Sequence, residues 1–285
     1  MPWTTLIEVE ELALRLDDCV VVDCRHSLLE PDAGRRAWLA GRIPGARFLH
    51  QDEDLASPIG PDTGRHPLPD PQALRRRLAD LGLVRQTQLV AYDDAGGATA
   101  ARLWWLARWL GHEAVAVLDG GLPAWQAAGY PLESGDPAPS RHAPVEPAQG
   151  EALVRPVEVE AIEHNLVQPT LMLVDARSAE RYRGEAEPID PVAGHIPGAL
   201  NHPLTRNLRP DGRFLPAPLL RQAFLELLDG RPAESVVHYC GSGVSACHNL
   251  LAMEHAGLPG SLLYGGSWSQ WCSDPSRPVA TRERD

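Results

Sequence analysis

Residues 236–246 have the sequence VVHYCGSGVSA, in which a short apolar strand runs into a glycine-rich loop and then into a stretch with helical spacing up to residue 255. Strands that are apolar on both faces and alternate with helices are typical of parallel sheets wrapped by helices. In such sheets, ligands bind beyond the carboxyl ends of the strands, where loops lead into helices. This stretch therefore predicts an α/β fold with a binding loop at residues 240–246.

Both halves of the chain carry the same landmarks in the same order. Each half has a strand that ends in an acid followed two residues later by an arginine, then a Gly-x-Ile-Pro-Gly-Ala element, a second strand with a glycine-containing loop and a helix, and a double glycine before a tryptophan. The acid–x–arginine strands lie at 20–25 and 173–177, and the Gly-x-Ile-Pro-Gly-Ala elements at 41–46 and 194–199. The second strands lie at 89–92 and 236–239, and the double glycines with their tryptophans at 120–125 and 265–271. A period of about 150 residues is the length of a domain.

We therefore expect two copies of one small α/β domain, each a parallel β-sheet flanked by helices, at residues 1–133 and 151–285. The segment 134–150 between them contains four prolines and little apolar periodicity, which is typical of a linker. Helices are expected at 98–110, 219–228 and 246–255 from their apolar spacing.

Composition limits the classes of function. The 285 residues are 44% apolar and 22% charged, the balance of a globular protein with a core. A net charge of −12 argues against a nucleic-acid partner, because binding phosphates requires clustered Lys and Arg. No apolar run approaches the ~20 residues that span a bilayer, and no secretory signal is visible. We expect no membrane partner and a cytoplasmic location.

The five cysteines, an odd number at irregular spacing, include no C-x-x-C pair, so neither a zinc site nor a disulfide framework is predicted. Cys240 differs from the others by its surroundings. Gly241, Ser242 and Gly243 allow the backbone to curl so that successive N–H groups form an anion-binding nest, and a helix beginning near Ser245 adds its positive end. A cysteine in such a nest is favoured as thiolate, whereas elsewhere it is usually a small buried apolar residue.

The first half has an acid where the second half has its nucleophile. Alignment on Ala100 and Ala246 places Asp94 opposite Cys240, whereas alignment on the tyrosines that end the two strands places Asp93 there. With either alignment the first copy cannot perform covalent thiol chemistry, and its expected role is structural.

These landmarks resemble the tandem-domain rhodanese superfamily of sulfurtransferases over almost the whole chain. The loop CGSGVS at 240–245 resembles the CGSGVT loop of 3-mercaptopyruvate sulfurtransferases, and it lacks the basic side chain that thiosulfate sulfurtransferases usually carry there. The resemblance implies that Cys240 carries a persulfide, held by the loop residues Gly241, Gly243, Val244 and Ser245. It implies no metal or organic cofactor.

The resemblance also implies helpers for this chemistry. Ser242 matches the loop serine, His66 a histidine of the first domain, and Asp52 an acid upstream of it, so the three are expected to form a Ser–His–Asp relay. Without the resemblance, His66 would be interpreted as a surface histidine.

Arg181 matches an arginine that binds the carboxylate of the substrate. The second arginine of mercaptopyruvate enzymes, nine residues later, is Asp190 in this chain, as in thiosulfate-type members, and Arg183 or Arg65 could replace it. Arg25 and Arg177 are expected to pair with Asp23 and Asp175 for structural reasons.

The expected function is transfer of a sulfane sulfur from 3-mercaptopyruvate through a Cys240 persulfide to a small thiol, a thioredoxin-like protein or cyanide. Thiosulfate is the alternative donor, and a non-catalytic binding module is a more remote alternative. A cysteine phosphatase is excluded because its loop needs a histidine before the cysteine and an arginine six residues after it, where this chain has Tyr239 and Ala246.

Overall fold

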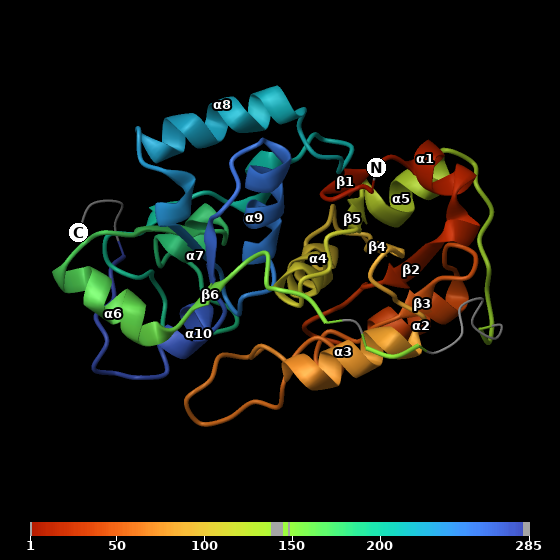
Figure 1. The fold of residues 1–285 in the computed structure, drawn as a ribbon. Helices are drawn as coiled ribbons and strands as arrows, with labels where there is room; N and C mark the ends of the chain where they lie inside the picture. Colours follow the sequence, from red (N-terminus) through yellow and green to blue (C-terminus); the bar gives the residue numbers. More distant parts are fainter. Residues whose placement is uncertain (1, 138–144, 148, 282–285) are drawn as a thin grey trace. The chain divides into compact units, whose positions relative to one another are not determined.

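A computed structural model describes residues 2–137, 145–147 and 149–281. The chain forms two compact units (Figure 1). The first consists of Met1–Ser57, Leu68–Leu153 and Arg209–Phe214, and the second of Pro58–Pro67, Val154–Leu208 and Leu215–Asp285. The ranges predicted from sequence did not anticipate that segment 58–67 belongs to the second unit. Eight of the 17 residues of the predicted linker, 138–144 and 148, lie outside the described residues.

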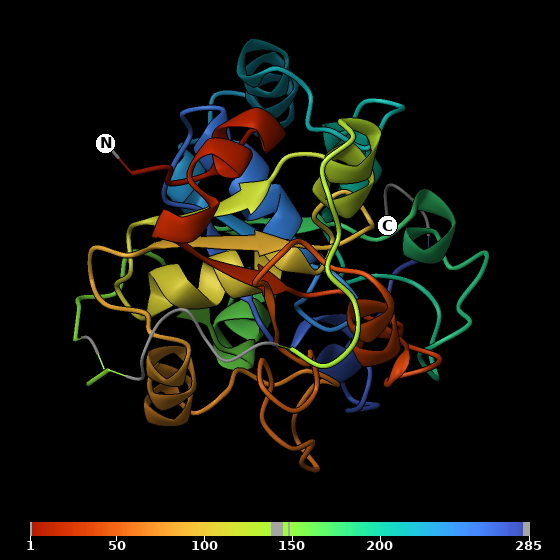
Figure 2. The ribbon, with the colours of Figure 1, turned by 90° about the vertical axis from the view of Figure 1, so that its right-hand side faces the viewer.

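The first unit is a five-stranded parallel sheet with the strand order β1-β5-β4-β2-β3. Its elements are β1 (Leu6–Ile7), α1 (Val9–Leu14), β2 (Cys19–Asp23), α2 (Ala33–Ala40), β3 (Arg47–Phe48), α3 (Pro71–Asp80), β4 (Gln88–Tyr92), α4 (Ala100–Trp109), β5 (Val115–Leu118) and α5 (Gly121–Ala127). Figure 2 shows its strands side by side, with α1 (red) on one side and α4 (yellow) on the other.

The second unit repeats this plan with the strand order β6-β10-β9-β7-β8, again all parallel. Its elements are β6 (Pro156–Val157), α6 (Val159–Val167), β7 (Met172–Asp175), α7 (Ala179–Tyr182), β8 (Leu200–Asn201), α8 (Ala217–Leu228), β9 (Val236–Tyr239), α9 (Ala246–His255), β10 (Leu262–Tyr264) and α10 (Ser267–Trp271). The α/β class, the duplication and the three predicted helices are confirmed.

Each sheet is buried on both faces, as its apolar strands predict. In the second unit, Ile162 of α6 and Trp271 of α10 pack with Leu173 and Val237 on one face. On the other face α9 packs against β9 and β10 and lies beside α8 (Figure 1). Burial of both faces fixes the direction in which β9 leaves the sheet, and therefore the position of the loop that follows it.

A buried ion pair ties the Gly-x-Ile-Pro-Gly-Ala element to the sheet of each unit. Asp175 and Arg177 are joined by a bond of 2.6 Å, and their side chains are 0% and 1% exposed. Arg177 also donates to the Gly194 carbonyl at 2.6 Å, and the Ile196 N–H donates to the hydroxyl of Tyr239 at 3.3 Å. Although burial opposes the charge, Asp175 raises the pKa of Arg177 above its usual value. The predicted structural role of the pair is confirmed.

The first unit has the same arrangement. Arg25 donates to Asp23 at 2.7 Å and to the Gly41 carbonyl at 2.7 Å, while the Ile43 N–H donates to the Tyr92 hydroxyl at 3.3 Å. The repeated acid–x–arginine pattern is therefore an architectural feature that holds a loop at the carboxyl edge of the sheet.

Replacing Asp175 by asparagine removes the nearer of the two carboxylates that neutralise the buried Arg177, the other being Glu187 at 3.2 Å. We expect Asp175→Asn to lower the free energy of unfolding of the second unit by about 3–5 kcal/mol, measured by urea denaturation. Asp229→Asn is the control, because Asp229 is exposed in a left-handed conformation that asparagine also adopts. A loss of stability no larger than that of the control would contradict the structural role of the pair.

Candidate active site

The loop after β9 curls as its glycines predict. Gly243 has φ +80, and a Cβ on it would lie 2.3 Å from the carbonyl oxygen of Gly265. Only glycine fits this close approach in a left-handed conformation. The loop then enters α9 with Ser245 as its N-cap residue. The sharp turn brings the backbone around Cys240, which is 1% exposed.

One amide of this loop contacts the cysteine sulfur, and three neighbouring amides have no partner among the described residues. The Gly243 N–H donates to Cys240 Sγ at 3.2 Å. The N–H groups of Ser242, Val244 and Ser245 form no hydrogen bond with any residue that the structure describes. Buried N–H groups usually have an acceptor, so a cluster of open donors beside one sulfur is suited to an additional anionic atom.

Ser267 and Trp268 hold the backbone of Cys240 in place. The Oγ of Ser267 accepts the Cys240 N–H at 3.1 Å and donates to the Tyr264 carbonyl at 2.9 Å. This serine is fully buried and has φ +54, a conformation that is costly for a residue with a Cβ. The N–H of Trp268 then donates to the Cys240 carbonyl at 3.0 Å. Both backbone groups of Cys240 are thus fixed by the start of α10.

The first unit contains the same loop with a carboxylate in place of the thiol. Asp93 follows the strand β4 as Cys240 follows β9, and its carbonyl accepts the Leu122 N–H at 2.8 Å, as the Cys240 carbonyl accepts that of Trp268. Asp93 is buried, whereas Asp94 is exposed. Of the two alignments left open by the sequence, the structure therefore selects Asp93.

The carboxylate of Asp93 fills the amide nest of its loop. It accepts N–H bonds from four residues at 2.8–2.9 Å, namely Ala95, Gly97, Thr99 and Ala100. A loop of this design therefore binds a negatively charged group directly beyond the end of the strand. In the second unit the same space is bounded by Cys240 Sγ and the open amides.

His66 lies within the second unit beside the cysteine loop. Its Nδ1 and the Oγ of Ser242 share a hydrogen bond of 2.7 Å, and both residues are buried. The structure thus joins two members of the expected relay. Asp52 belongs to the first unit, where its N–H donates to His50 Nδ1 at 3.2 Å. Its place in a relay stays a prediction.

The segment that carries His66 is anchored to α10. The Arg65 N–H donates to Ser269 Oγ at 3.0 Å, and Gln270 Nε2 donates to the Asp62 carbonyl at 2.8 Å. A Cβ on Gly64 would lie 2.3 Å from the Gly266 carbonyl oxygen, so only glycine permits this approach. The fixed segment brings Arg65 and His66 to the loop.

Two guanidinium groups lie next to the residue that follows the nucleophile. A Cβ on Gly241 would be 2.8 Å from Arg65 Nη2 and 3.6 Å from both Nη atoms of Arg181. Arg181, which the sequence predicted as a substrate-binding residue, therefore lies next to the loop. Of the two candidates for a second arginine, Arg65 shares this place, whereas Arg183 pairs with the exposed Glu185 at 2.8 Å.

Buried carboxylates hold these arginines. Arg181 pairs with Glu187 at 2.6 Å and with Asp190 at 3.2 Å, and Arg65 pairs with the other oxygen of Asp190. Burial raises the pKa of Asp190, an effect that Arg65 partly offsets. Burial also acts to raise the pKa of Glu187, but Arg181 and the N–H donors of Ile189 and Asp190 together outweigh it, so that pKa is lowered.

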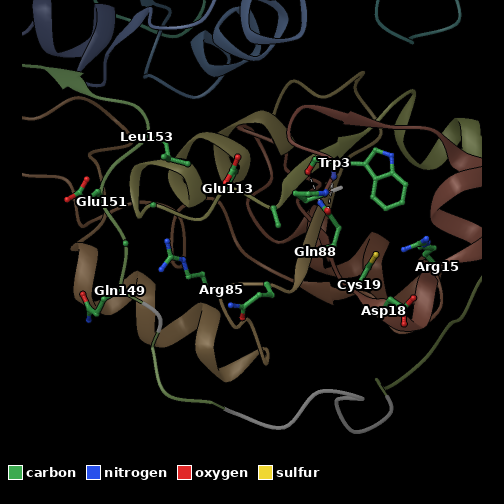
Figure 3. A pocket seen from close by; sticks show the side chains of 15 residues that line it. Trp3, Arg15, Asp18, Cys19, Arg85, Gln88, Glu113, Gln149, Glu151 and Leu153 are labelled. Atoms are coloured by element: carbon green, nitrogen blue, oxygen red, sulfur yellow. Dashed lines mark hydrogen bonds between the residues drawn. The ribbon is translucent and has the colours of Figure 1, made fainter.

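A separate cavity of about 1220 Å³ lies in the first unit, at the amino ends of β2 and β4 (Figure 3). Trp3, Cys19 and Arg85 are among its lining residues. Burial and the neighbouring Asp18 raise the pKa of Cys19 to about 11, so its thiol stays protonated near neutrality. This cavity is at the edge of the sheet opposite to Asp93 and holds no activated nucleophile.

Comparison with known proteins supports the duplication. The family model described as a rhodanese-like domain matches twice, at residues 8–128 and 158–274. The chain belongs to the rhodanese family. The two matches cover the two sheets with their helices, apart from the edge strands β1 and β6.

Relatives of this rhodanese extend over its whole length. It is 49% identical, over 99% of both chains, to a Pseudomonas aeruginosa protein named "Probable 3-mercaptopyruvate sulfurtransferase". It is 33% identical to the mitochondrial "Thiosulfate/3-mercaptopyruvate sulfurtransferase 1" of Arabidopsis thaliana, over 95% of this chain and 76% of that protein. The structure of a 3-mercaptopyruvate sulfurtransferase from Leishmania major superposes with a TM-score of 0.83 at 32% identity, covering 93% of this chain and 73% of that one.

In the described part of this rhodanese, no helix is long and apolar enough to cross a membrane.

The cysteines should differ in reactivity. Near neutral pH we expect iodoacetamide to label Cys240 before Cys272, because the attacking species is the thiolate and burial raises the pKa of Cys272 to about 11. Labelling of Cys272 should increase as the pH rises toward that value. Peptide mass spectrometry after timed labelling measures both rates, and equal labelling of the two thiols near neutrality would contradict the activation of Cys240.

Proposed function

We propose that this rhodanese is a sulfurtransferase that accepts a sulfane sulfur on Cys240 and passes it to a second nucleophile. The observation that carries this proposal is the Gly243 N–H bond to Cys240 Sγ beside loop amides that have no partner among the described residues, together with the four amides that bind the carboxylate of Asp93 in the equivalent loop. A persulfide is an anion one sulfur atom longer than the thiolate, and the open donors suit its terminal sulfur.

The reaction has two displacements. The Cys240 thiolate attacks the sulfur of 3-mercaptopyruvate, the carbon–sulfur bond breaks, and the carbon takes up the electron pair and a proton to give pyruvate. The acceptor then attacks the terminal sulfur of the persulfide, and the sulfur–sulfur bond breaks to release the Cys240 thiolate. These steps need only a nucleophile, proton transfer and anion stabilisation, so the mechanism uses no metal or organic cofactor.

Arg181 and Arg65 are proposed to bind the carboxylate of the donor. Their guanidinium groups lie beside Gly241, and their side chains are 18% and 23% exposed, so part of each group is open to a ligand. A guanidinium presents paired donors that match a carboxylate. The loop residues Gly241, Gly243, Val244 and Ser245 are proposed to hold the sulfur.

Ser242 and His66 are proposed to move the proton that the first step requires. Their hydrogen bond of 2.7 Å couples a hydroxyl two residues from Cys240 to an imidazole, a side chain that commonly acts as a general acid or base. Asp52 is proposed as the third member, orienting His66.

Thiosulfate is the alternative donor, and the name of the Arabidopsis relative includes both donors. The loop 240–246 has no basic side chain, which favours the monocarboxylate. The proposed acceptors are cyanide, a small thiol or a thioredoxin-like protein. We infer a cytoplasmic setting, since no disulfide joins any of the five cysteines, all of which are described.

Replacing the nucleophile tests the proposed function. We expect Cys240→Ser to abolish thiocyanate formation from cyanide with either donor, because a hydroxyl does not form a persulfide. After incubation with donor, mass spectrometry of the wild-type protein should find one added sulfur atom on Cys240. Cys272→Ser is the control and should keep full activity. Turnover by Cys240→Ser would refute the mechanism, and a wild-type chain that forms no persulfide would indicate a binding module.

The segment that carries Arg65 and His66 can be tested with two glycines. Gly64→Ala places a Cβ against the Gly266 carbonyl and should displace the segment, whereas a Cβ on Gly60 meets only Thr63 at an ordinary 3.5 Å. We expect Gly64→Ala to lower kcat/KM with 3-mercaptopyruvate by about a hundredfold, which is the lower end of the range for lost acid–base catalysis. Gly60→Ala should leave kcat/KM unchanged. Equal activity of both variants would argue against a role for the segment.

A further inference from the structure

Asp190 is a buried residue of the second unit that takes no direct part in the proposed transfer of sulfur. Its two carboxylate oxygens bind different partners, one Arg65 and the other Arg181, the latter at 3.2 Å. Its N–H donates to Glu187 Oε1 at 3.1 Å. One buried carboxylate therefore bridges the two guanidinium groups that lie beside Gly241.

The acids and the arginines of this cluster differ in exposure. The Asp190 and Glu187 side chains are 2% and 3% exposed, whereas those of Arg65 and Arg181 are 23% and 18% exposed. The carboxylates thus form the buried side of the cluster, and a ligand meets the arginines first. Arg65 Nε, although buried, makes no hydrogen bond with any described residue, which leaves a donor for an incoming anion.

The charges of the cluster cancel. Arg65 and Arg181 carry two positive charges, and Glu187 and Asp190 carry two negative charges at contact distance. Arg177 also contacts Glu187, at 3.2 Å, and its charge is balanced by Asp175 at 2.6 Å. The N–H groups of the two arginines can therefore still donate to a carboxylate. The cluster as a whole, however, adds little net positive potential at the site. A second negative charge on a donor, close to the Cys240 thiolate, would be compensated poorly.

We propose that Asp190 is the specificity-determining residue of this site: by bridging Arg65 and Arg181 it positions both guanidinium groups for one carboxylate and cancels the positive charge that a dianionic donor would need. This inference rests on the proposed sulfur transfer and concerns only the choice of donor. Asp190 touches no reacting atom, so it acts through the two arginines.

The experiment compares kcat/KM for 3-mercaptopyruvate, a monocarboxylate, and for thiosulfate, a dianion, in the wild type and in Asp190→Asn. Asparagine keeps the shape and a hydrogen-bonding oxygen but removes one negative charge. We expect the ratio of kcat/KM for thiosulfate to that for 3-mercaptopyruvate to rise about tenfold or more, mainly through a lower KM for thiosulfate. The gain should shrink at high salt, because screening weakens a charge effect.

Three further variants complete the test. Asp229→Asn removes an exposed acid of the same unit and should leave the ratio unchanged. Adding Arg65→Ala to Asp190→Asn should abolish the gain, because the uncompensated guanidinium is its source. Asp190→Ser serves as a second charge-removing variant if the asparagine variant does not fold.

An unchanged ratio in the folded charge-removing variant would overturn the proposal, and so would an equal fall in kcat/KM for both donors. These results differ from a failure of sulfur transfer itself, which would appear as the absence of a Cys240 persulfide in the wild-type chain.

Discussion

Backbone amides that converge at the end of a strand need a negative partner, and this need organises both units of the chain. In the first unit the need is met internally, since the Asp93 carboxylate accepts four N–H groups of its own loop. In the second unit a smaller sulfur takes its place and leaves amide donors open. The difference between a structural loop and a reactive one is therefore whether the side chain after the strand satisfies the amides.

The fold could be predicted because its causes are local and occur twice. Apolar strands alternating with helices indicate a parallel sheet, and the acid–x–arginine pattern and the double glycines mark the same points of each copy. The shape of the loop after Cys240 could also be predicted, because the conformation of Gly243 and the start of α9 are properties of a few adjacent residues. The structure adds the reason for the Gly-x-Ile-Pro-Gly-Ala element, whose carbonyl and amide groups bind the buried arginine and tyrosine of each unit.

Features that depend on distant residues could not be predicted. The choice between Asp93 and Asp94 depends on the pairing of β2 with β4, because the first loop is one residue longer than the second. The role of Ser267 depends on a left-handed backbone conformation that its residue type does not signal. Asp190 differs from the arginine that the family resemblance leads one to expect, and its bridging of two arginines appears only when segment 58–67 is placed.

The segment Pro58–Pro67 shows that the two units do not divide the chain at a single point. The ten residues Pro58–Pro67 are encoded within the first copy but fold with the second, and they carry an arginine and a histidine beside its nucleophile. No single cut in the chain separates a complete reactive half from a silent one. The first copy therefore supplies residues to the loop of the second, although it has an aspartate where the second copy has Cys240.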